Sequence, residues 1–361
     1  MHAIQVNAAI EGPVVLNDIG FELCREFLSP GGDRFFRQIR LYVDIMGDVL
    51  QKPNYLPGTA AKFILPFLKA AGLTNARVQE FSRQNLKFMP GARGVYRFLI
   101  HLGVPVFLVS TSYRPFALAL AQELKIAEDR VCATNMDLDR HTLPETERAE
   151  LERLRTAILE APDLAAGSAS ASAKTLPAKV KETIDQFDRI FTEAIPAMGI
   201  GRLLEDVTIV GGAEKLSAVQ ESLGQTKLAL ENVLYVGDNF TDAEAFEAVA
   251  GGGGVGISFN GTPDAAAAAQ VIVVSDSAWS VALLSSIYRR WGKEGVYELM
   301  TMTQAAQQKI LAIPAGEIEP LMTGLEGKLF NLYQADTPKL AQVKEESAAM
   351  RSRLRQAAMA G

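Results

Sequence analysis

VLYVGDNFTD, residues 233–242, is the segment most specific for one class of fold. Its apolar first half is typical of a buried strand; the run stops at Gly237, and two carboxylates follow four residues apart. Such a loop carries both acids at the carboxyl edge of a parallel sheet, where divalent cations find oxygen ligands. The segment therefore predicts a magnesium loop with Asp238 and Asp242 as ligands. The alternative is a polar turn that opens a helix, with Asp242 in its first turn.

Short apolar runs of the same kind recur along the chain, separated by helical patterns. They comprise residues 4–8, 104–109, 130–134, 207–210, 254–259 and 271–274. Runs of this length that end in polar residues or glycine are typical of strands buried on both faces. The pattern predicts an α/β fold, with a Rossmann-like, mostly parallel sheet and helices on both of its faces.

Two long helical stretches interrupt this alternation. Residues 21–88 are expected to form a helical cap, and residues 139–204 a second insertion in which two amphipathic stripes predict a helical hairpin. The small, uncharged residues 165–172 between the stripes predict a mobile connection. Residues 286–361 are expected to form a C-terminal helical extension. The predicted core then consists of residues 1–20, 89–138 and 205–285.

Composition limits the classes of function. The 361 residues are 48% hydrophobic, which is enough for a sizeable core, and the formal net charge of −6 argues against nucleic acid as a main partner. Two cysteines are too few for a disulfide framework and lack the spacing of a zinc site. No apolar run approaches the roughly 20 residues of a membrane span, and no secretory signal precedes the first strand. A cytoplasmic location is therefore expected.

Two residues at the ends of other predicted strands suit phosphate chemistry, which requires donors that neutralise the phosphoryl oxygens. Ser110 follows residues 104–109 and can donate its hydroxyl and a neighbouring backbone amide. Lys215 opens a helix after residues 207–210, so its ammonium can point back over the sheet edge. Either residue alone has a plainer explanation, a helix cap for the serine and a surface position for the lysine. Their order at successive strand ends favours one common site.

This order resembles the haloacid dehalogenase-like (HAD-like) hydrolase superfamily, in particular its phosphatase-like members. The family's motifs are Asp-x-Asp, a strand-end Ser or Thr, a Lys, and Gly-Asp-x-x-x-Asp. The matching segments here are Ala9–Pro13, with a Glu-Gly-Pro variant of the first motif, Ser110, Lys215 and Gly237–Asp242. The resemblance covers the predicted core. It implies Mg²⁺, a cap that closes over substrate, and phosphomonoester hydrolysis.

The first motif departs from the family at one position. In the family the first acid attacks phosphorus and becomes an aspartyl-phosphate, while the second protonates the leaving oxygen and later activates water. Here the first position is Ala9, which can neither attack nor bind Mg²⁺, and Glu11 replaces the second acid. The favoured interpretation is a nucleophilic aspartate replaced by alanine, which inactivates the chain. The alternatives are a naturally inactive relative and a misplaced register, for which Asp18 is a poor substitute.

The resemblance also implies the remaining roles. Glu11 would act as acid and base, and would join Asp238 and Asp242 at the metal through its backbone carbonyl. The phosphate-binding set would be Gly12, Ser110, Thr111 and Lys215. The predicted function is a Mg²⁺-dependent phosphomonoester hydrolase for a small phosphorylated metabolite, inactive as written. The alternative is a non-catalytic HAD-like protein that binds such a metabolite or acts as a scaffold.

Two groups of arginines bear on substrate and partners. Arg34, Arg37 and Arg40 lie on one side of a predicted cap helix and can hold a second anionic group, although a solvated helix face is favoured. Residues 351–355 contain three arginines, and a solvated face is favoured there as well. A homo-oligomer formed through the C-terminal helices is an expected partner.

Overall fold

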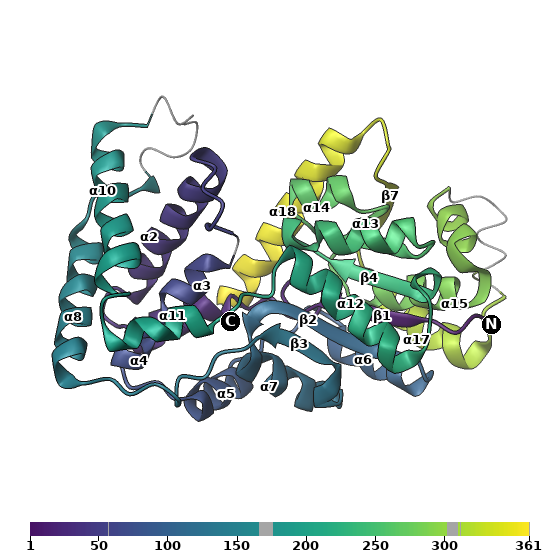
Figure 1. Ribbon diagram of the computed structural model, residues 1–361. Helices are drawn as coiled ribbons and strands as arrows, with labels where there is room; N and C mark the ends of the chain where they lie inside the picture. Colours follow the sequence, from purple (N-terminus) through teal and green to yellow (C-terminus); the bar gives the residue numbers. More distant parts are fainter. Residues whose placement is uncertain (57, 166–175, 302–309, 311, 361) are drawn as a thin grey trace.

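The structure is a computed structural model, and it describes residues 1–56, 58–165, 176–301, 310 and 312–360. A seven-stranded sheet flanked by helices forms one lobe, and a helical lobe lies beside it (Figure 1). The predicted fold class is confirmed: this is an α/β fold with a mostly parallel sheet. In the described part of the chain, no helix has the length and apolar character that crossing a membrane requires.

The sheet has the order β3-β2-β1-β4-β5-β6-β7, and all neighbours are parallel except β6 and β7. Its strands are β1 (Gln5–Ala9), β2 (Val106–Tyr113), β3 (Val131–Thr134), β4 (Val233–Gly237), β5 (Val255–Phe259), β6 (Val271–Ser275) and β7 (Phe330–Gln334). Ala8 of β1 lies opposite Leu108 of β2 and Val236 of β4. From β1 the chain continues to β2 and β3 on one side of the sheet and then crosses to β4 on the other side of β1. The carboxyl ends of β1, β2 and β4 therefore lie at the point where α/β sheets bind ligands.

Helices cover both faces of the sheet (Figure 1). The helices of the sheet lobe are α5 (Asn75–Gln84), α6 (Ala92–His101), α7 (Arg114–Leu124), α12 (Gly212–Thr226), α13 (Ala243–Gly251), α14 (Pro263–Ala268), α15 (Trp279–Met300), α17 (Ala315–Leu325) and α18 (Leu340–Ala360). The helical lobe contains α1 (Ile19–Phe27), α2 (Gly32–Asp44), α3 (Thr59–Phe63), α4 (Leu65–Ala70), α8 (Glu145–Glu160), α10 (Ala178–Arg189) and α11 (Arg202–Asp206).

Two predicted elements differ from the structure. Residues 207–210, expected to be a strand, form irregular chain, because the Val210 N–H donates to Thr134 Oγ1 at 3.0 Å instead of to a neighbouring strand. The extension 286–361, expected to be helical to its end, contains β7. This strand pairs antiparallel with β6, Ile272 opposite Tyr333, and covers what would be an open edge.

The two insertions pack together as one helical lobe: α8 contacts both α2 and α4. The hydroxyls of Tyr42 and Tyr55 donate to Asp188 Oδ1 at 3.0 and 2.8 Å, and the rings of Phe63 and Phe191 stack with centroids 4.3 Å apart. These contacts join residues from both insertions, so the two segments form one cover beside the sheet.

The predicted helical hairpin of the second insertion corresponds to α8 and α10, whose apolar stripes are buried. Residues 166–172 of the predicted mobile connection lie outside the described residues. At the end of the first insertion, α5 packs against α7 of the sheet lobe, and Phe81 of α5 also contacts Phe27 of α1 with ring centroids 5.4 Å apart. The boundaries 21–88 and 139–204 otherwise stay predictions.

Candidate active site

A cavity of about 240 Å³ lies at the carboxyl edge of the sheet, between the sheet and the helical lobe. The predicted site residues that line it are Ala9, Glu11, Ser110, Thr111, Lys215 and Asp238. They come from β1, β2, the start of α12 and the end of β4, segments far apart in sequence. The structure thus brings these residues to one place. Gly12 and Asp242 are not among the lining residues.

The end of β1 contributes Ala9 and Glu11. Ala9 is the last residue of the strand and is 3% exposed, and Glu11 follows in the loop. A methyl group at position 9 offers the cavity no nucleophile and no metal donor. Glu11 is therefore the acid that the first motif presents to the cavity.

Gly12 has a steric role in place of the predicted phosphate-binding role. Its N–H donates to Val15 O at 2.7 Å, so the amide is already used. Its φ of +103° is in the region that favours glycine, and a Cβ there would lie 2.5 Å from Asp238 Cγ. Gly12 thus allows the loop after β1 to pass directly over Asp238.

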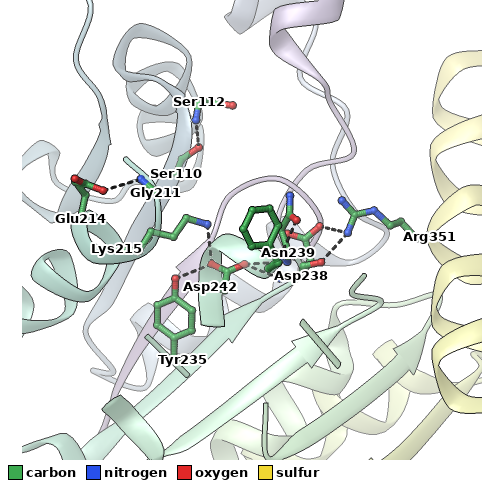
Figure 2. A network of polar contacts seen from close by, with 11 residues as sticks. Ser110, Ser112, Gly211, Glu214, Lys215, Tyr235, Asp238, Asn239, Asp242 and Arg351 are labelled. Atoms are coloured by element: carbon green, nitrogen blue, oxygen red, sulfur yellow. Dashed lines mark hydrogen bonds and ion pairs between the residues drawn. The ribbon is translucent and has the colours of Figure 1, made fainter. Parts of the chain in front are cut away.

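Ser110 and Thr111 lie where the register between β2 and β3 shifts. The strand was expected to end before Ser110, but β2 continues to Tyr113. Ser110 Oγ accepts the Ser112 N–H at 2.9 Å, a contact that leaves the hydroxyl proton of Ser110 free for another acceptor (Figure 2). The irregularity thus orients a hydroxyl at the cavity.

Lys215 and Asp242 form a buried ion pair, with Lys215 Nζ 2.7 Å from Asp242 Oδ1. The same oxygen accepts the Tyr235 hydroxyl at 2.8 Å, and Oδ2 accepts the N–H groups of Asp238 and Asn239 at 3.0 and 2.9 Å (Figure 2). A carboxylate has about four acceptor positions, and all are used here. In this structure Asp242 positions Lys215 and closes the loop after β4, and its metal-ligand role stays a prediction.

Asp238 faces a residue that the sequence interpretation placed in solvent. Arg351 of α18 lies with Nη1 2.5 Å from Asp238 Oδ2, and the same nitrogen donates to the Asp238 backbone oxygen at 2.8 Å (Figure 2). The Arg351 side chain is 16% exposed and that of Asp238 6%. Burial raises the pKa of Asp238, and Arg351 opposes that rise. The C-terminal helix is thus part of the site.

The sequence contains a pattern that indicates how α18 packs on the sheet lobe. Val343, Ser347, Met350 and Leu354 are buried at the spacing of one helix face. That face packs on β6 and α14, and Ser347 Oγ donates to Gly261 O at 2.9 Å. The stripe is short and only partly apolar, so the basic residues beside it suggested a solvated helix.

The side chains of this chain do not fit the predicted Mg²⁺ site. Mg²⁺ needs near-octahedral oxygen ligands, usually with one or two carboxylates. Ala9 supplies none, Asp242 already accepts from four protein donors, and Asp238 is paired with Arg351. Among the described residues, no group of three or more Asp, Glu, His or Cys side chains is arranged to hold a metal ion. The positive charge beside Asp238 comes from a guanidinium.

The helical lobe contributes one of the three arginines predicted on its helix to the cavity. Arg40 lines it and pairs with Asp18 at 2.8 Å, and Asp18 also caps α1. Arg37 pairs with Asp33 on the surface, and Arg34 donates to a backbone oxygen. Asp18 is thus engaged, which agrees with its poor suitability as a replacement nucleophile.

Burial raises the pKa of Glu11 from 4.5 to about 7, with a further rise from Asp18 and an opposing effect of the hydrogen bond with Ser112. A proton is therefore retained on this acid near neutral pH. A group with this property can donate a proton to a leaving oxygen and later accept one from water.

We expect Glu11→Gln to stabilise the fold at high pH. Because the pKa is raised on folding, the stability that protonated Glu11 contributes is complete below 4.5 and is lost as pH rises through about 7. Glutamine does not ionise, so its contribution to stability does not fall as pH rises. The difference in unfolding free energy between the variant and the native chain should therefore shift in favour of the variant by up to about 3 kcal/mol from pH 4 to pH 8. Urea unfolding across this range measures it. A pH-independent difference between the two proteins would contradict the assignment.

Comparison with known proteins identifies relatives by structure. No family model matches the chain, and none of the curated proteins matches it. Gene product AF1437 from Archaeoglobus fulgidus is similar, with 25% identity, a TM-score of 0.75, and coverage of 98% of this chain and 97% of that chain. The fold of that protein is thus shared over nearly the whole of both chains.

Other structural neighbours include a phosphoserine phosphatase in apo form, with 14% identity, a TM-score of 0.42, and coverage of 75% of this chain and 92% of that chain. A HAD family hydrolase from Salmonella enterica subsp. enterica serovar Typhi is similar with 13% identity, a TM-score of 0.43, and coverage of 72% of this chain and 63% of that chain.

Proposed function

We propose that this chain has the site of a HAD-like phosphomonoester hydrolase that acts through an aspartyl-phosphate, with Ala9 at the nucleophile position. With alanine at position 9, the chain would bind a small phosphorylated metabolite without hydrolysing it. One observation carries the proposal: Ala9, Glu11, Ser110 and Lys215 line one cavity at the carboxyl edge of the sheet. A hydroxyl donor, an ammonium and a protonated acid are the groups that phosphoryl transfer uses.

The roles follow from these positions. Ser110 and Lys215 would bind the phosphoryl oxygens, Lys215 being held in place by Asp242. With an aspartate at position 9, its carboxylate would attack phosphorus, and the leaving oxygen would take the proton of Glu11. Glu11 would then take a proton from the water that attacks the aspartyl-phosphate, which releases phosphate and restores both carboxyl groups. A Mg²⁺ requirement is proposed only for a chain that has an aspartate at position 9, because that carboxylate and the one of Asp238 would then both be available as ligands.

The experiment is Ala9→Asp. The native chain should release no phosphate from an aryl phosphate or from a panel of metabolite phosphates, and the variant should release it at a rate at least about 10³-fold above the background without enzyme. Each protein is assayed with MgCl₂ and with EDTA. Ala9→Asn, which is similar in size but not nucleophilic, is the matched control and should stay inactive.

The non-catalytic alternative is favoured by two observations, the missing nucleophile and the contact of Arg351 with Asp238. If Ala9→Asp folds and binds phosphate but hydrolyses nothing, the protein is a binding module and the hydrolase proposal fails. A homo-oligomer through the C-terminal helices stays a prediction. Within one chain α18 already packs its buried face on β6 and α14.

A further inference from the structure

The cavity has more positive side chains than the predicted motifs supply. The basic residues that line it are Arg40, Lys215, Arg351 and Arg355. Three of them are paired with carboxylates: Arg40 with Asp18 at 2.8 Å, Lys215 with Asp242 at 2.7 Å, and Arg351 with Asp238 at 2.5 Å. Each of these cations is therefore already neutralised by a neighbour.

Arg355 is different. It lines the cavity and is partly buried, yet its guanidinium makes no hydrogen bond or ion pair with any residue that the structure describes. Burial lowers the pKa of Arg355, and the neighbouring Arg351 lowers it further. A guanidinium has five donors that need acceptors, and leaving them unmet in a partly buried position is unfavourable.

The acids near Arg355 do not fill this need. The carboxylates that favour its charge are those of Asp238, Glu11 and Asp18. Asp238 and Asp18 are bonded to Arg351 and Arg40, and among the described residues no ion pair joins Glu11 to Arg355. The cap acids Asp44 and Asp48 also line the cavity but form no ion pair with Arg355 among the described residues.

The C-terminal helix holds Arg355 in this place. Met350 and Leu354 are buried on the sheet lobe, and Arg351 and Arg355, one turn apart, share the adjacent side of α18. Arg353 points elsewhere: its side chain is 61% exposed and lies 3.5 Å from Asp276. α18 ends at the junction of the two lobes (Figure 1), so the helix delivers these two arginines to the cavity.

We propose that Arg355, supported by Arg351, forms an oxyanion-binding subsite that the C-terminal helix adds to the cavity. Its ligand is an oxyanion of the bound molecule, either the phosphoryl group or a carboxylate on the same metabolite. A guanidinium binds both in a bidentate manner. The inference rests on the proposed function of the cavity as a phosphoryl site, but it requires no hydrolysis and no metal.

The test measures binding to the native, full-length protein by titration calorimetry in EDTA. The probes are inorganic phosphate, ethyl phosphate, and 2-phosphoglycolate, which adds a carboxylate to a similar frame. Arg355→Met should weaken binding of at least one probe by about 10- to 100-fold, the effect of a lost charge-assisted hydrogen bond. Arg355→Lys keeps the positive charge but not the paired N–H donors of the guanidinium, so it should weaken binding less than Arg355→Met does. Arg353→Met, on the same helix but facing solvent, is the matched control and should bind as the native chain does.

The pattern of losses identifies the bound group. Equal loss for all three probes places the phosphoryl group on Arg355, whereas loss for 2-phosphoglycolate alone places its carboxylate there. Either result supports the subsite, provided that circular dichroism and unfolding curves show a native fold. The inference is overturned if the native chain binds no probe, if Arg355→Met binds all three as the native chain does, or if Arg353→Met loses as much.

The two proposals fail in different ways. If Arg355→Met weakens binding while Ala9→Asp hydrolyses nothing, the hydrolase proposal fails and the subsite stands. If Ala9→Asp releases phosphate while Arg355→Met leaves binding unchanged, the subsite fails and the hydrolase proposal stands.

Discussion

Adding Glu11→Gln to the Ala9→Asp variant is expected to lower phosphate release by about 10²- to 10⁴-fold. The amide is close in size to the acid and leaves the cavity filled, but it carries no transferable proton. Both halves of the proposed reaction depend on that proton, since the leaving oxygen must receive one and the attacking water must give one up. Glu11 is also the acid whose burial raises its pKa to about 7, which suits both tasks near neutral pH.

The dependence on leaving group sharpens this test. A nitrophenolate leaves without much help from an acid, so formation of the aspartyl-phosphate from an aryl phosphate should suffer less than its formation from an alkyl phosphate. Rapid-quench measurements of the two steps separate them. Glu244→Gln, an exposed substitution outside the cavity, serves as the control and should leave both rates unchanged. Equal rates for Glu11 and Gln at this position with an alkyl phosphate would contradict the acid and base role.

The sheet could be predicted because its signal is local. Strands such as β4 and β6 are buried on both faces, so they appear as short continuous apolar runs bounded by polar residues or glycine. Residues 207–210 show the same run and yet form no strand, since burial of apolar residues does not require pairing in the ladder. β7 was not predicted for the opposite reason: it is an edge strand whose residues are partly exposed, so its sequence has no continuous apolar run.

The cavity was predictable in part for a related reason. Parallel strands place their carboxyl ends at one edge, and β1 alone separates β2 from β4, so Ser110 and Asp238 come near each other. The contribution of α18 could not be inferred in this way. Arg351 lies 113 residues after Asp238, and their contact depends on how the extension packs on β6 and α14. The function of Asp242 also depended on hydrogen bonds that motif spacing does not encode.

Lys215→Met is expected to lower the free energy of unfolding by about 3 to 5 kcal/mol, because removing one partner leaves a buried charge without compensation. Lys215 and Asp242 have side chains that are 4% and 0% exposed, and their atoms lie 2.7 Å apart. Arg37→Met, which breaks the pair with Asp33 on the surface, is the control. Those side chains are 61% and 44% exposed, so the loss there should stay under about 1 kcal/mol.

The hydrogen bonds that Asp242 retains decide where in this range the loss falls. The Tyr235 hydroxyl and two backbone N–H groups still donate to the carboxylate after the lysine is removed. They keep the loop after β4 closed and partly stabilise the negative charge, which favours the lower end, about 3 kcal/mol. Chemical denaturation of both variants at one pH measures the difference. A loss for Lys215→Met no larger than that for Arg37→Met would mean that the buried pair contributes little and that Asp242 is held by its other donors alone.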